Sequence, residues 1–362
     1  MKLVVNQKNL KKAVGLVEKV VSKNTSLPIL GNILLKTENG RLRLSATNLE
    51  LGINALIGVK IDEVGEIAIP AKIFSDFINT VQDEKVSFVT KNNTLTINAE
   101  KYKTNILGFD SKDFPIIPKI KSEAIVTMSA SMLKSALVKV VDSMAVSETR
   151  PELAGVFVQI NENQCILVAT DIFRLSEVTI PVISTGKASM ILPRNTVAEL
   201  VRMCGDIEGD IQIKYSDNQV AFVAEDVELV SRVVDGTYPP YKNVIPEKFI
   251  SKALIKKTDL ESNIRLAGLF SSSISDVKIL CENNNLKITA QNSDKGEIET
   301  DIPINLKNEA FELSLNYRYI LDGIKNISSN EIIIEFTGAG SPLIMRPSED
   351  KSFVYLIMPL RN

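Results

Sequence analysis

The chain has 362 residues, of which 44% are hydrophobic and 24% are charged, and its formal net charge is −2. This is ordinary globular composition, and the length predicts two or three domains. No apolar run approaches the length of about 18 residues that a membrane-spanning helix requires. The N-terminal segment lacks the apolar stretch of a signal peptide, so we expect neither secretion nor a membrane association.

Histidine is absent from the chain, which excludes Ser-His-Asp and Cys-His catalysis and most zinc and non-haem iron sites. The three cysteines, Cys165, Cys204 and Cys281, are isolated and odd in number, so they predict neither a disulfide framework nor a zinc site. We interpret them as small core residues of a protein in the reducing cytoplasm, and we expect no metal, no other cofactor and no catalytic residues.

The first elements in chain order are a helix, a block of strands and a second helix. Apolar residues from Leu10 to Val21 recur at helical spacing. The segment GRLRLSATNLELG (40–52) alternates apolar and polar residues, which predicts a half-buried strand. The segment PAKIFSDFINTV (70–81) returns to helical spacing.

The same elements recur about 123 residues later, and then again. The strand block returns as QCILVATDIFRLS (164–176) and NLKITAQNSDKGE (285–297). The third copy of the first helix, DLESNIRLAGLF (259–270), is shifted by about four further residues. The apolar positions of the second helix are Phe74, Phe77, Ile78 and Val81, then Val197, Leu200, Val201 and Cys204, then Ile320, Gly323, Ile324 and Ile327.

These repeats predict three domains in a row, with boundaries in Pro-rich, lysine-bearing segments near 121 and 248. The expected domains are therefore 1–121, 122–248 and 249–362. Because strands come in runs and helices are few, the fold class is α+β.

Six segments carry a resemblance to a known family. They are LPILGNILL (27–35), LSATNLEL (44–51), VATDIFRL (168–175), VDGTYPPYKNVIP (234–246), LNYRYILDGI (315–324) and YLIMPLRN (355–362). With these segments in order, the chain resembles the bacterial DNA polymerase III beta subunit, the DNA sliding clamp, from end to end. The resemblance implies three clamp domains whose helices line a central hole, with antiparallel sheets outside, in a head-to-tail ring dimer. It also implies a non-catalytic processivity factor that encircles duplex DNA and tethers the replicative polymerase.

A ring that slides must hold DNA through phosphates and without sequence preference. Basic residues gather on the expected helices, whereas acidic residues concentrate in strands and loops. Many family members have Arg where this chain has Asn24, and Lys23 stands beside that position as a substitute. The residues expected to face DNA are Lys8, Lys11, Lys12, Lys19, Lys23, Lys134, Lys139, Arg194, Arg202, Lys256, Lys257 and Arg265.

The resemblance places the dimer contact at edge strands of the first and third domains. The matching apolar residues are Ile106 on one side and Leu269 and Phe270 on the other. Lysines lie near the first edge and glutamates near the second, so we expect complementary charge across the seam.

The resemblance further implies a cleft between the second and third domains, into which polymerase and clamp-loader subunits insert short peptides with apolar anchors. Ile172 and Phe173 stand where many members have Gly and His, and Asn243 where a basic residue is frequent, which predicts a more apolar cleft. An alternative is that Leu175, Val244 and Leu356 are ordinary core residues. The matching residues are Leu153, Thr170, Ile172, Phe173, Arg174, Leu175, Pro239, Asn243, Val244, Tyr319, Pro342, Leu356, Ile357, Met358, Pro359, Leu360 and Arg361.

Two other functions fit parts of the pattern. One is a peptide-binding scaffold that does not encircle DNA. The other is a carboxylate-based hydrolase, because FDS (109–111) and VDG (234–236) resemble the paired turns of aspartic proteases. That match fails where Lys112 replaces the glycine of the first turn and where no hydroxyl follows Asp235. Aspartates in turns usually cap their own backbone.

Asp171, in VATDIFRLSEV (168–178), has the setting of a catalytic carboxylate at the end of a strand. In the other repeats the matching residues are Asn48 and Asn292. We therefore predict that Asp171 forms a turn, and that the IFRL segment after it lines the cleft.

Overall fold

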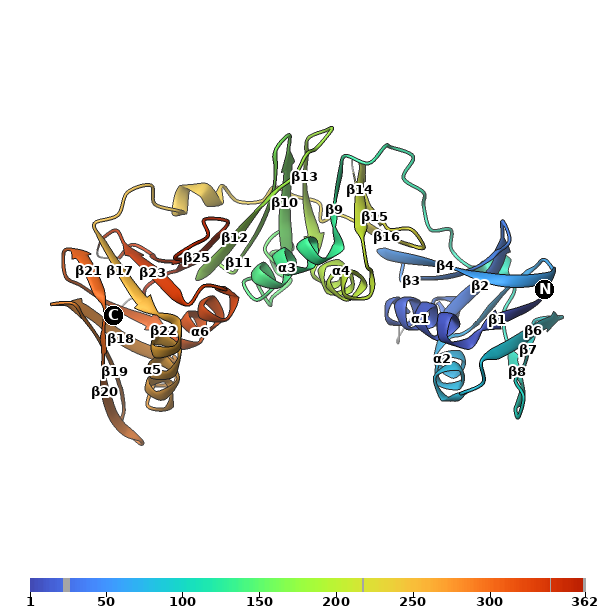
Figure 1. The fold of residues 1–362 in the computed structure, drawn as a ribbon, viewed down its shortest axis with the longest axis horizontal. Helices are drawn as coiled ribbons and strands as arrows, with labels where there is room; N and C mark the ends of the chain where they lie inside the picture. The colour runs from blue at the N-terminus through green and yellow to red at the C-terminus, as the bar shows by residue number, and fades with distance from the viewer. Residues whose placement is uncertain (22–26, 217, 339, 361–362) are drawn as a thin grey trace. The chain divides into compact units, whose positions relative to one another are not determined.

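A computed structural model describes residues 1–21, 27–216, 218–338 and 340–360. The chain divides into two compact units (Figure 1). The first unit consists of Met1–Leu133, Ser184–Gly186 and Ala198–Val233, and the second of Lys134–Ile183, Lys187–Val197 and Val234–Asn362.

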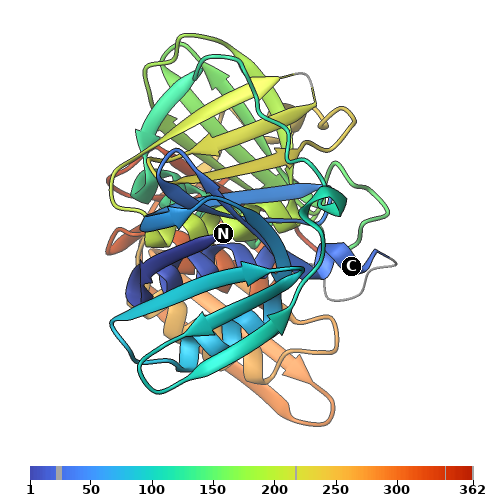
Figure 2. The same ribbon diagram turned by 90° about the vertical axis from the view of Figure 1, so that its right-hand side faces the viewer.

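Within the described residues, the strands of the first unit form a 12-stranded antiparallel sheet. Figure 2 shows its β6–β8 end in cyan and teal. The sheet crosses the predicted repeat boundary, because β4 pairs with β16. The strands are β1 (Lys2–Asn6), β2 (Asn32–Glu38), β3 (Arg41–Thr47), β4 (Leu51–Glu63), β5 (Glu66–Pro70), β6 (Lys85–Lys91), β7 (Thr94–Asn98), β8 (Lys103–Leu107), β9 (Val126–Ser129), β14 (Asp210–Ser216), β15 (Gln219–Val223) and β16 (Val227–Arg232).

The described strands of the second unit form a 9-stranded and a 4-stranded antiparallel sheet. The larger sheet crosses the second predicted boundary through the pairing of β12 with β25. Its strands are β10 (Gly155–Asn161), β11 (Gln164–Thr170), β12 (Arg174–Pro181), β13 (Ala188–Pro193), β17 (Ser251–Lys256), β21 (Asn305–Asn308), β23 (Glu331–Phe336), β24 (Leu343–Pro347) and β25 (Phe353–Ile357). The smaller sheet contains β18 (Asp276–Glu282), β19 (Asn285–Asn292), β20 (Gly296–Pro303) and β22 (Phe311–Asn316).

Helix pairs pack on these sheets, with α1 against α2 in the first unit and α5 against α6 in the second. The α-helices are α1 (Gln7–Val17), α2 (Ala71–Thr80), α3 (Ala130–Val141), α4 (Arg194–Asp206), α5 (Lys257–Leu269) and α6 (Tyr317–Asn326). Short 3₁₀ segments are η1 (Glu18–Val20), η2 (Pro28–Gly31), η3 (Ser111–Asp113) and η4 (Tyr241–Val244).

The predicted helical register of α2, α4 and α6 is confirmed. Phe74, Val197 and Ile320 occupy its first position, and each is buried. The fourth position, at Val81, Cys204 and Ile327, is buried as well. The helices thus pack their apolar stripe inward, as a 3.6-residue period requires. The predicted four-residue shift of α5 is also correct, because its buried residues begin at Leu260, four positions later than the repeat alone would place them.

The first helix of each of the first two repeats ends earlier than its apolar spacing predicts. Val21 and Met144 continue the pattern in sequence, but α1 ends at Val17 and α3 at Val141. After α1 the chain tightens into the 3₁₀ segment η1, which is a common way for a helix to terminate. Met144 is nevertheless buried. The apolar spacing therefore predicted the burial of this residue correctly, but it predicted a helix that is too long.

The helix α6 has glycine, Gly323, at a position where α2 and α4 have large apolar residues. This glycine occupies the repeat position of Phe77 and Leu200. A Cβ built at Gly323 would lie 2.5 Å from Cδ1 of Tyr355, whose ring is fully buried. Tyr355 therefore fills the space that a larger helix residue would need.

Gly323→Ala should lower the free energy of unfolding by about 1–3 kcal/mol, because the added methyl group overpacks against a buried ring. The matched control is Gly15→Ala in α1, where nothing described lies within 4 Å of the added Cβ. That control should stabilise the protein by about 0.5–1 kcal/mol, since alanine favours a helix. Urea unfolding of both variants checks the pair, and equal effects would contradict the packing explanation.

Candidate functional site

The turn that joins β11 to β12 is built by side-chain hydrogen bonds to its own backbone. Asp171 Oδ1 accepts hydrogen bonds from the backbone N–H groups of Phe173 and Arg174, both at 3.0 Å. Thr170 Oγ1 donates to the carbonyl of Arg174 at 2.7 Å and accepts from the N–H of Ile172 at 3.1 Å. These bonds satisfy the groups that the sheet leaves unpaired where the strand ends.

The first repeat contains the same turn between β3 and β4. Asn48 Oδ1 accepts from the N–H groups of Glu50 and Leu51, and Thr47 Oγ1 donates to the carbonyl of Leu51 at 2.9 Å. In the third repeat Asn292 Oδ1 accepts from the N–H of Asp294. The predicted turn-forming role of Asp171 is therefore confirmed, because the side-chain amides of Asn48 and Asn292 accept backbone hydrogen bonds at the matching positions.

Ile172 has a backbone conformation that is unfavourable for its side chain. Its φ is 73°, and the matching Leu49 has φ 77°. Branched side chains are rarely found in this left-handed region, which glycine adopts freely. Ile172 is 57% exposed and Leu49 52% exposed, so neither side chain gains much from packing.

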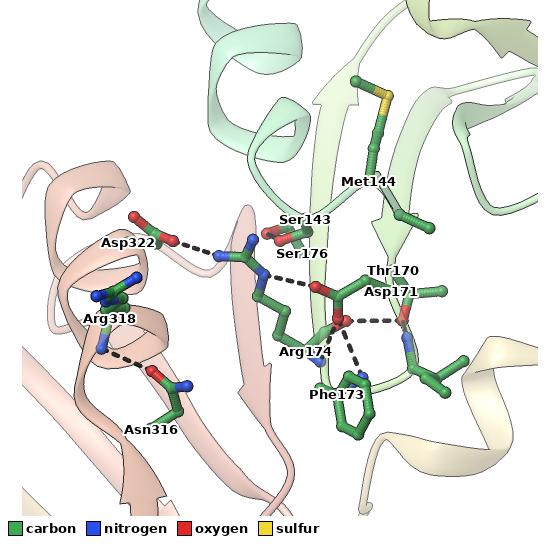
Figure 3. Close-up of polar contacts among 12 residues, drawn as sticks. Ser143, Met144, Thr170, Asp171, Phe173, Arg174, Ser176, Asn316, Arg318 and Asp322 are labelled. Carbon is green, nitrogen blue, oxygen red and sulfur yellow. Dashed lines mark hydrogen bonds and ion pairs between the residues drawn. The ribbon is translucent and has the colours of Figure 1, made fainter. Parts of the chain in front are cut away.

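Arg174 is held in place on three sides, and Figure 3 shows its contacts with Asp171 and Asp322. Its Nε donates to Asp171 Oδ2 at 3.0 Å, and its Nη1 pairs with Asp322 of α6. The guanidinium carbon lies 4.4 Å from the centre of the Tyr319 ring. Burial, and then the nearby carboxylate of Asp171, raises the pKa of the Tyr319 phenol, which keeps that ring neutral beneath the cation.

Sequence reasoning did not identify Asp322. A signal was present, because the repeat places an acidic residue at the same helix position in every copy, at Asp76, Glu199 and Asp322. The pairing became visible only with the structure, since Asp322 and Arg174 are far apart in the sequence.

An apolar core supports this turn from below. Leu153, Leu175 and Leu356 are buried members of one cluster that also contains Tyr238 and Tyr241. The alternative interpretation of Leu175 and Leu356 as core residues is therefore compatible with their burial. Val244 differs, because 47% of its surface is exposed.

Above this core, several expected cleft residues are open to solvent. Phe173 is 55% exposed, and Pro239 and Asn243 are also exposed. Thr170 and Ile357 are buried, whereas Tyr319, Pro342, Met358, Pro359 and Leu360 are partly buried.

Backbone hydrogen bonds attach the segment after β25 to the β11–β12 turn and to β22. The N–H of Met358 donates to the carbonyl of Phe173, and the N–H of Leu360 donates to that of Ser314, both at 2.8 Å. This fixes the segment beside the β11–β12 turn. Arg361 lies outside the described residues.

The basic residues expected to face DNA separate into two groups. One group has exposed side chains: Lys8, Lys11, Lys12, Lys19, Lys134, Lys256 and Arg265. Within this group, Lys11 also donates to the carbonyl of Asn79 at 3.4 Å, and Lys19 and Arg265 pair with Glu18 and Glu261. Lys139 is partly buried, with its ammonium 5.7 Å from the centre of the Phe353 ring. Lys23 and Asn24 lie outside the described residues.

The other group donates to backbone carbonyls near helix ends. Arg202 donates to the carbonyls of Gly15 and Leu16 at the end of α1. Arg194 donates to the carbonyl of Ala145 at 2.7 Å, and Lys257 donates to that of Ile327, just after α6. These side chains pair with backbone carbonyl groups that helix ends and turns leave without a partner. The sequence alone did not distinguish this role from contact with DNA.

The strand β8 is an edge strand of the 12-stranded sheet, and β20 is an edge strand of the 4-stranded sheet. Ile106 of β8 is only 4% exposed within the chain, whereas its neighbour Leu107 is 75% exposed. Leu269 is 62% exposed and Phe270 is partly buried. The sequence analysis did not identify Leu107, although strand alternation places it on the face opposite Ile106.

Several other chemistries find no support among the described residues. All three cysteines are buried, and burial raises the pKa of Cys165 and Cys281 to about 12, so their thiols stay protonated. The described side chains contain no cluster of His, Cys, Asp or Glu that could hold a metal ion. No described helix is both long and apolar enough to cross a membrane.

Three repeats, each with two helices and antiparallel strands, and strand pairing across each repeat junction are typical of the class of three-domain clamp proteins. The chain belongs to the DNA polymerase III beta subunit family. The models of its N-terminal, central and C-terminal domains match residues 1–118, 127–240 and 242–361.

Known relatives extend this likeness over nearly the whole chain. The beta sliding clamp of Staphylococcus aureus (strain Mu50) is 28% identical over 358 residues, covering 95% of each chain. The DNA polymerase III beta subunit of Thermotoga maritima is 26% identical, with a TM-score of 0.93 over 100% of this chain and 99% of that one. The sliding clamp of Bartonella birtlesii bound to griselimycin is 28% identical, with a TM-score of 0.94 over 100% of both chains.

Replacing Asp171 separates its role in the turn from its role as a charge. Asp171→Ala removes both backbone hydrogen bonds and should lower the free energy of unfolding by about 1–3 kcal/mol. Asp171→Asn should cost less, because the amide preserves the turn as Asn48 does and loses only the ion pair with Arg174. Urea unfolding measures both, and equal losses for the two variants would contradict the turn role.

Proposed function

We propose that this chain is a DNA sliding clamp, a ring-shaped homodimer that encircles duplex DNA and tethers the replicative polymerase. The observation that carries the proposal is the family match in three consecutive domains across nearly the whole chain. The family is non-catalytic, and the clamp acts as a processivity factor in DNA replication. We place it in the cytoplasm and keep the domain boundaries 1–121, 122–248 and 249–362.

DNA would be held by the exposed basic residues of the helices. Phosphate contacts carry no sequence information, so the ring can move along the duplex. In this proposal Lys8 and Lys12 of α1 and Lys134 of α3 contribute most, because their side chains are exposed, whereas Lys11 is exposed but also donates to the carbonyl of Asn79. Arg194, Arg202 and Lys257 contribute less, since their side chains are engaged by backbone carbonyls.

Polymerase and clamp-loader subunits would dock at the cleft beside the β11–β12 turn through short apolar peptides. Ile172, Phe173 and Val244 offer exposed apolar surface there, and Met358 can repack around different anchors. The rigid Arg174 clamp would fix one wall, so partner peptides would meet a preorganised surface. The griselimycin-bound relative supports ligand binding by this fold.

The alternatives are less well supported. The hydrolase reading depended on Asp110 and Asp235, and Asp110 Oδ1 accepts a hydrogen bond from the N–H of Lys112, which is a capping role. A scaffold that does not encircle DNA shares the cleft with a clamp, so DNA binding and ring formation are the decisive measurements.

Binding to circular duplex DNA should be independent of sequence and should weaken steeply as salt rises. The triple variant Lys8→Ala/Lys11→Ala/Lys12→Ala should lower the slope of log affinity against log salt by about 2–3, since each lost phosphate contact contributes about 0.9.

The matched control for that triple variant replaces three exposed lysines on strands, Lys60, Lys85 and Lys91, with alanine. It should leave the slope near the wild-type value. Sequence-selective binding that is insensitive to salt would exclude a sliding clamp, and equal slopes for the two triple variants would exclude α1 as the DNA contact.

Leu269→Asp/Phe270→Asp should convert the dimer into monomers in sedimentation velocity, because two charges would enter a small apolar seam. Val146→Asp is the matched control, since Val146 is 89% exposed and lies outside the proposed seam. The control should remain dimeric. A dimer that survives the double substitution would place the interface elsewhere.

A further inference from the structure

The junction between the first and second repeats contains a counterpart of the proposed partner cleft. The N–H of Arg232 donates to the carbonyl of Glu50 at 2.9 Å, just as the N–H of Met358 donates to that of Phe173. Leu51 pairs with Ser231 as Arg174 pairs with Ile357. Both repeat junctions therefore contain the same turn, the same strand pairing, and the same hydrogen bond from the residue that follows the paired one.

A cavity of about 110 Å³ lies at this first junction. Its lining includes Leu49 from the β3–β4 turn and Ile116 from the segment after η3, and both side chains are largely exposed. An apolar cavity of about 150 Å³ accommodates benzene, so this smaller space suits one branched aliphatic side chain.

The base of this cavity is formed by Ile117. Gly52 stands where the second junction has Leu175, and a Cβ at Gly52 would lie 2.8 Å from Ile117. Ile117 therefore occupies the volume that Leu175 fills in the other copy, and it packs on the cluster of Ile120, Ala221 and Val230. The apolar base is kept, although different residues form it.

The mouth of the first-junction cavity differs from the partner cleft in charge. Arg232 replaces Met358, is exposed, and forms no ion pair with the residues that the structure describes. Lys119 follows Pro118, which lines the cavity, and is also exposed. In the second junction, by contrast, Arg174 is already paired with Asp171 and Asp322. Glu50 also lines the cavity, but Arg232 and Lys119 form no ion pair with the described residues, and these two cations beside a mostly apolar lining favour a ligand that combines an aliphatic anchor with a carboxylate.

We propose that the cavity at the first junction is a second docking site, which binds a short peptide through one aliphatic anchor and a flanking acidic residue. The inference rests on the proposed function in one respect, since the partner cleft is the model for its geometry. Leu49 supplies an anchor contact, as Ile172 does in the partner cleft. Arg232 pairs with the peptide carboxylate and makes the first junction the more salt-sensitive site.

Isothermal titration calorimetry with the synthetic peptide Ac-Glu-Leu-Asp-Leu-Phe-NH₂ tests the proposal on the full-length protein. Wild type should bind two peptides per chain. Leu49→Asn/Ile116→Ser should bind one, because it removes both exposed apolar contacts of the first junction. This variant should fold normally, since asparagine tolerates the left-handed backbone at position 49 and Ile116 is 91% exposed.

The companion variant Ile172→Asn/Phe173→Ser removes the corresponding contacts of the partner cleft and should also bind one peptide. The peptide that remains bound should be the salt-sensitive one. Arg232→Glu should weaken the first-junction site by about tenfold or more, and the peptide Ac-Lys-Leu-Lys-Leu-Phe-NH₂ should recover binding to that variant.

Each outcome decides between the two sites. One peptide per wild-type chain, lost only in Ile172→Asn/Phe173→Ser, overturns the second site and leaves the proposed function intact. One peptide lost only in Leu49→Asn/Ile116→Ser supports the second site and contradicts the partner cleft. No binding to any form overturns the second site, while the DNA and sedimentation measurements still test the clamp.

Discussion

Backbone pairing across each repeat junction is the constraint on which the rest of the structure depends. The strand β4 joins β16, and β12 joins β25, so two repeats share one sheet at each junction. Pairing satisfies N–H and C=O groups that would otherwise form an open edge. It also places the turn before β4 or β12 directly beside the end of the neighbouring repeat's last strand. Both proposed docking surfaces depend on that geometry.

The turn becomes a rigid feature because its polar groups are satisfied locally. Asp171 and Thr170 occupy the backbone groups, and the remaining carboxylate oxygen of Asp171 orients Arg174. Asp322 and Tyr319 then hold the same guanidinium from α6. The charge of Arg174 is thus already paired within the chain, and its side chain forms a fixed wall of the proposed cleft. The exposed apolar side chains of the cleft then determine which peptides it prefers.

The sequence predicted the parts of the fold that depend on local periodicity and on repetition. Helix registers and the role of Asp171 followed from comparing one repeat with another. Contacts between distant segments were out of reach, because nothing local distinguishes a lysine that caps a helix, such as Lys257, from one that faces solvent. Ile106 illustrates the same limit, since strand alternation alone does not say which face of β8 is covered.

The left-handed positions connect stability to binding. A branched residue at positive φ carries a conformational cost of order 1–3 kcal/mol, and an exposed apolar side chain recovers little of it by packing. Leu49 and Ile172 both carry this cost, whereas the third repeat has the polar Ser293 at the matching position. Burial under a peptide returns about 25 cal/mol for each Å² of apolar surface removed from water. Offsetting this cost therefore requires covering about 40–120 Å² of apolar surface, and a bound peptide that covers Leu49 or Ile172 supplies part or all of that area.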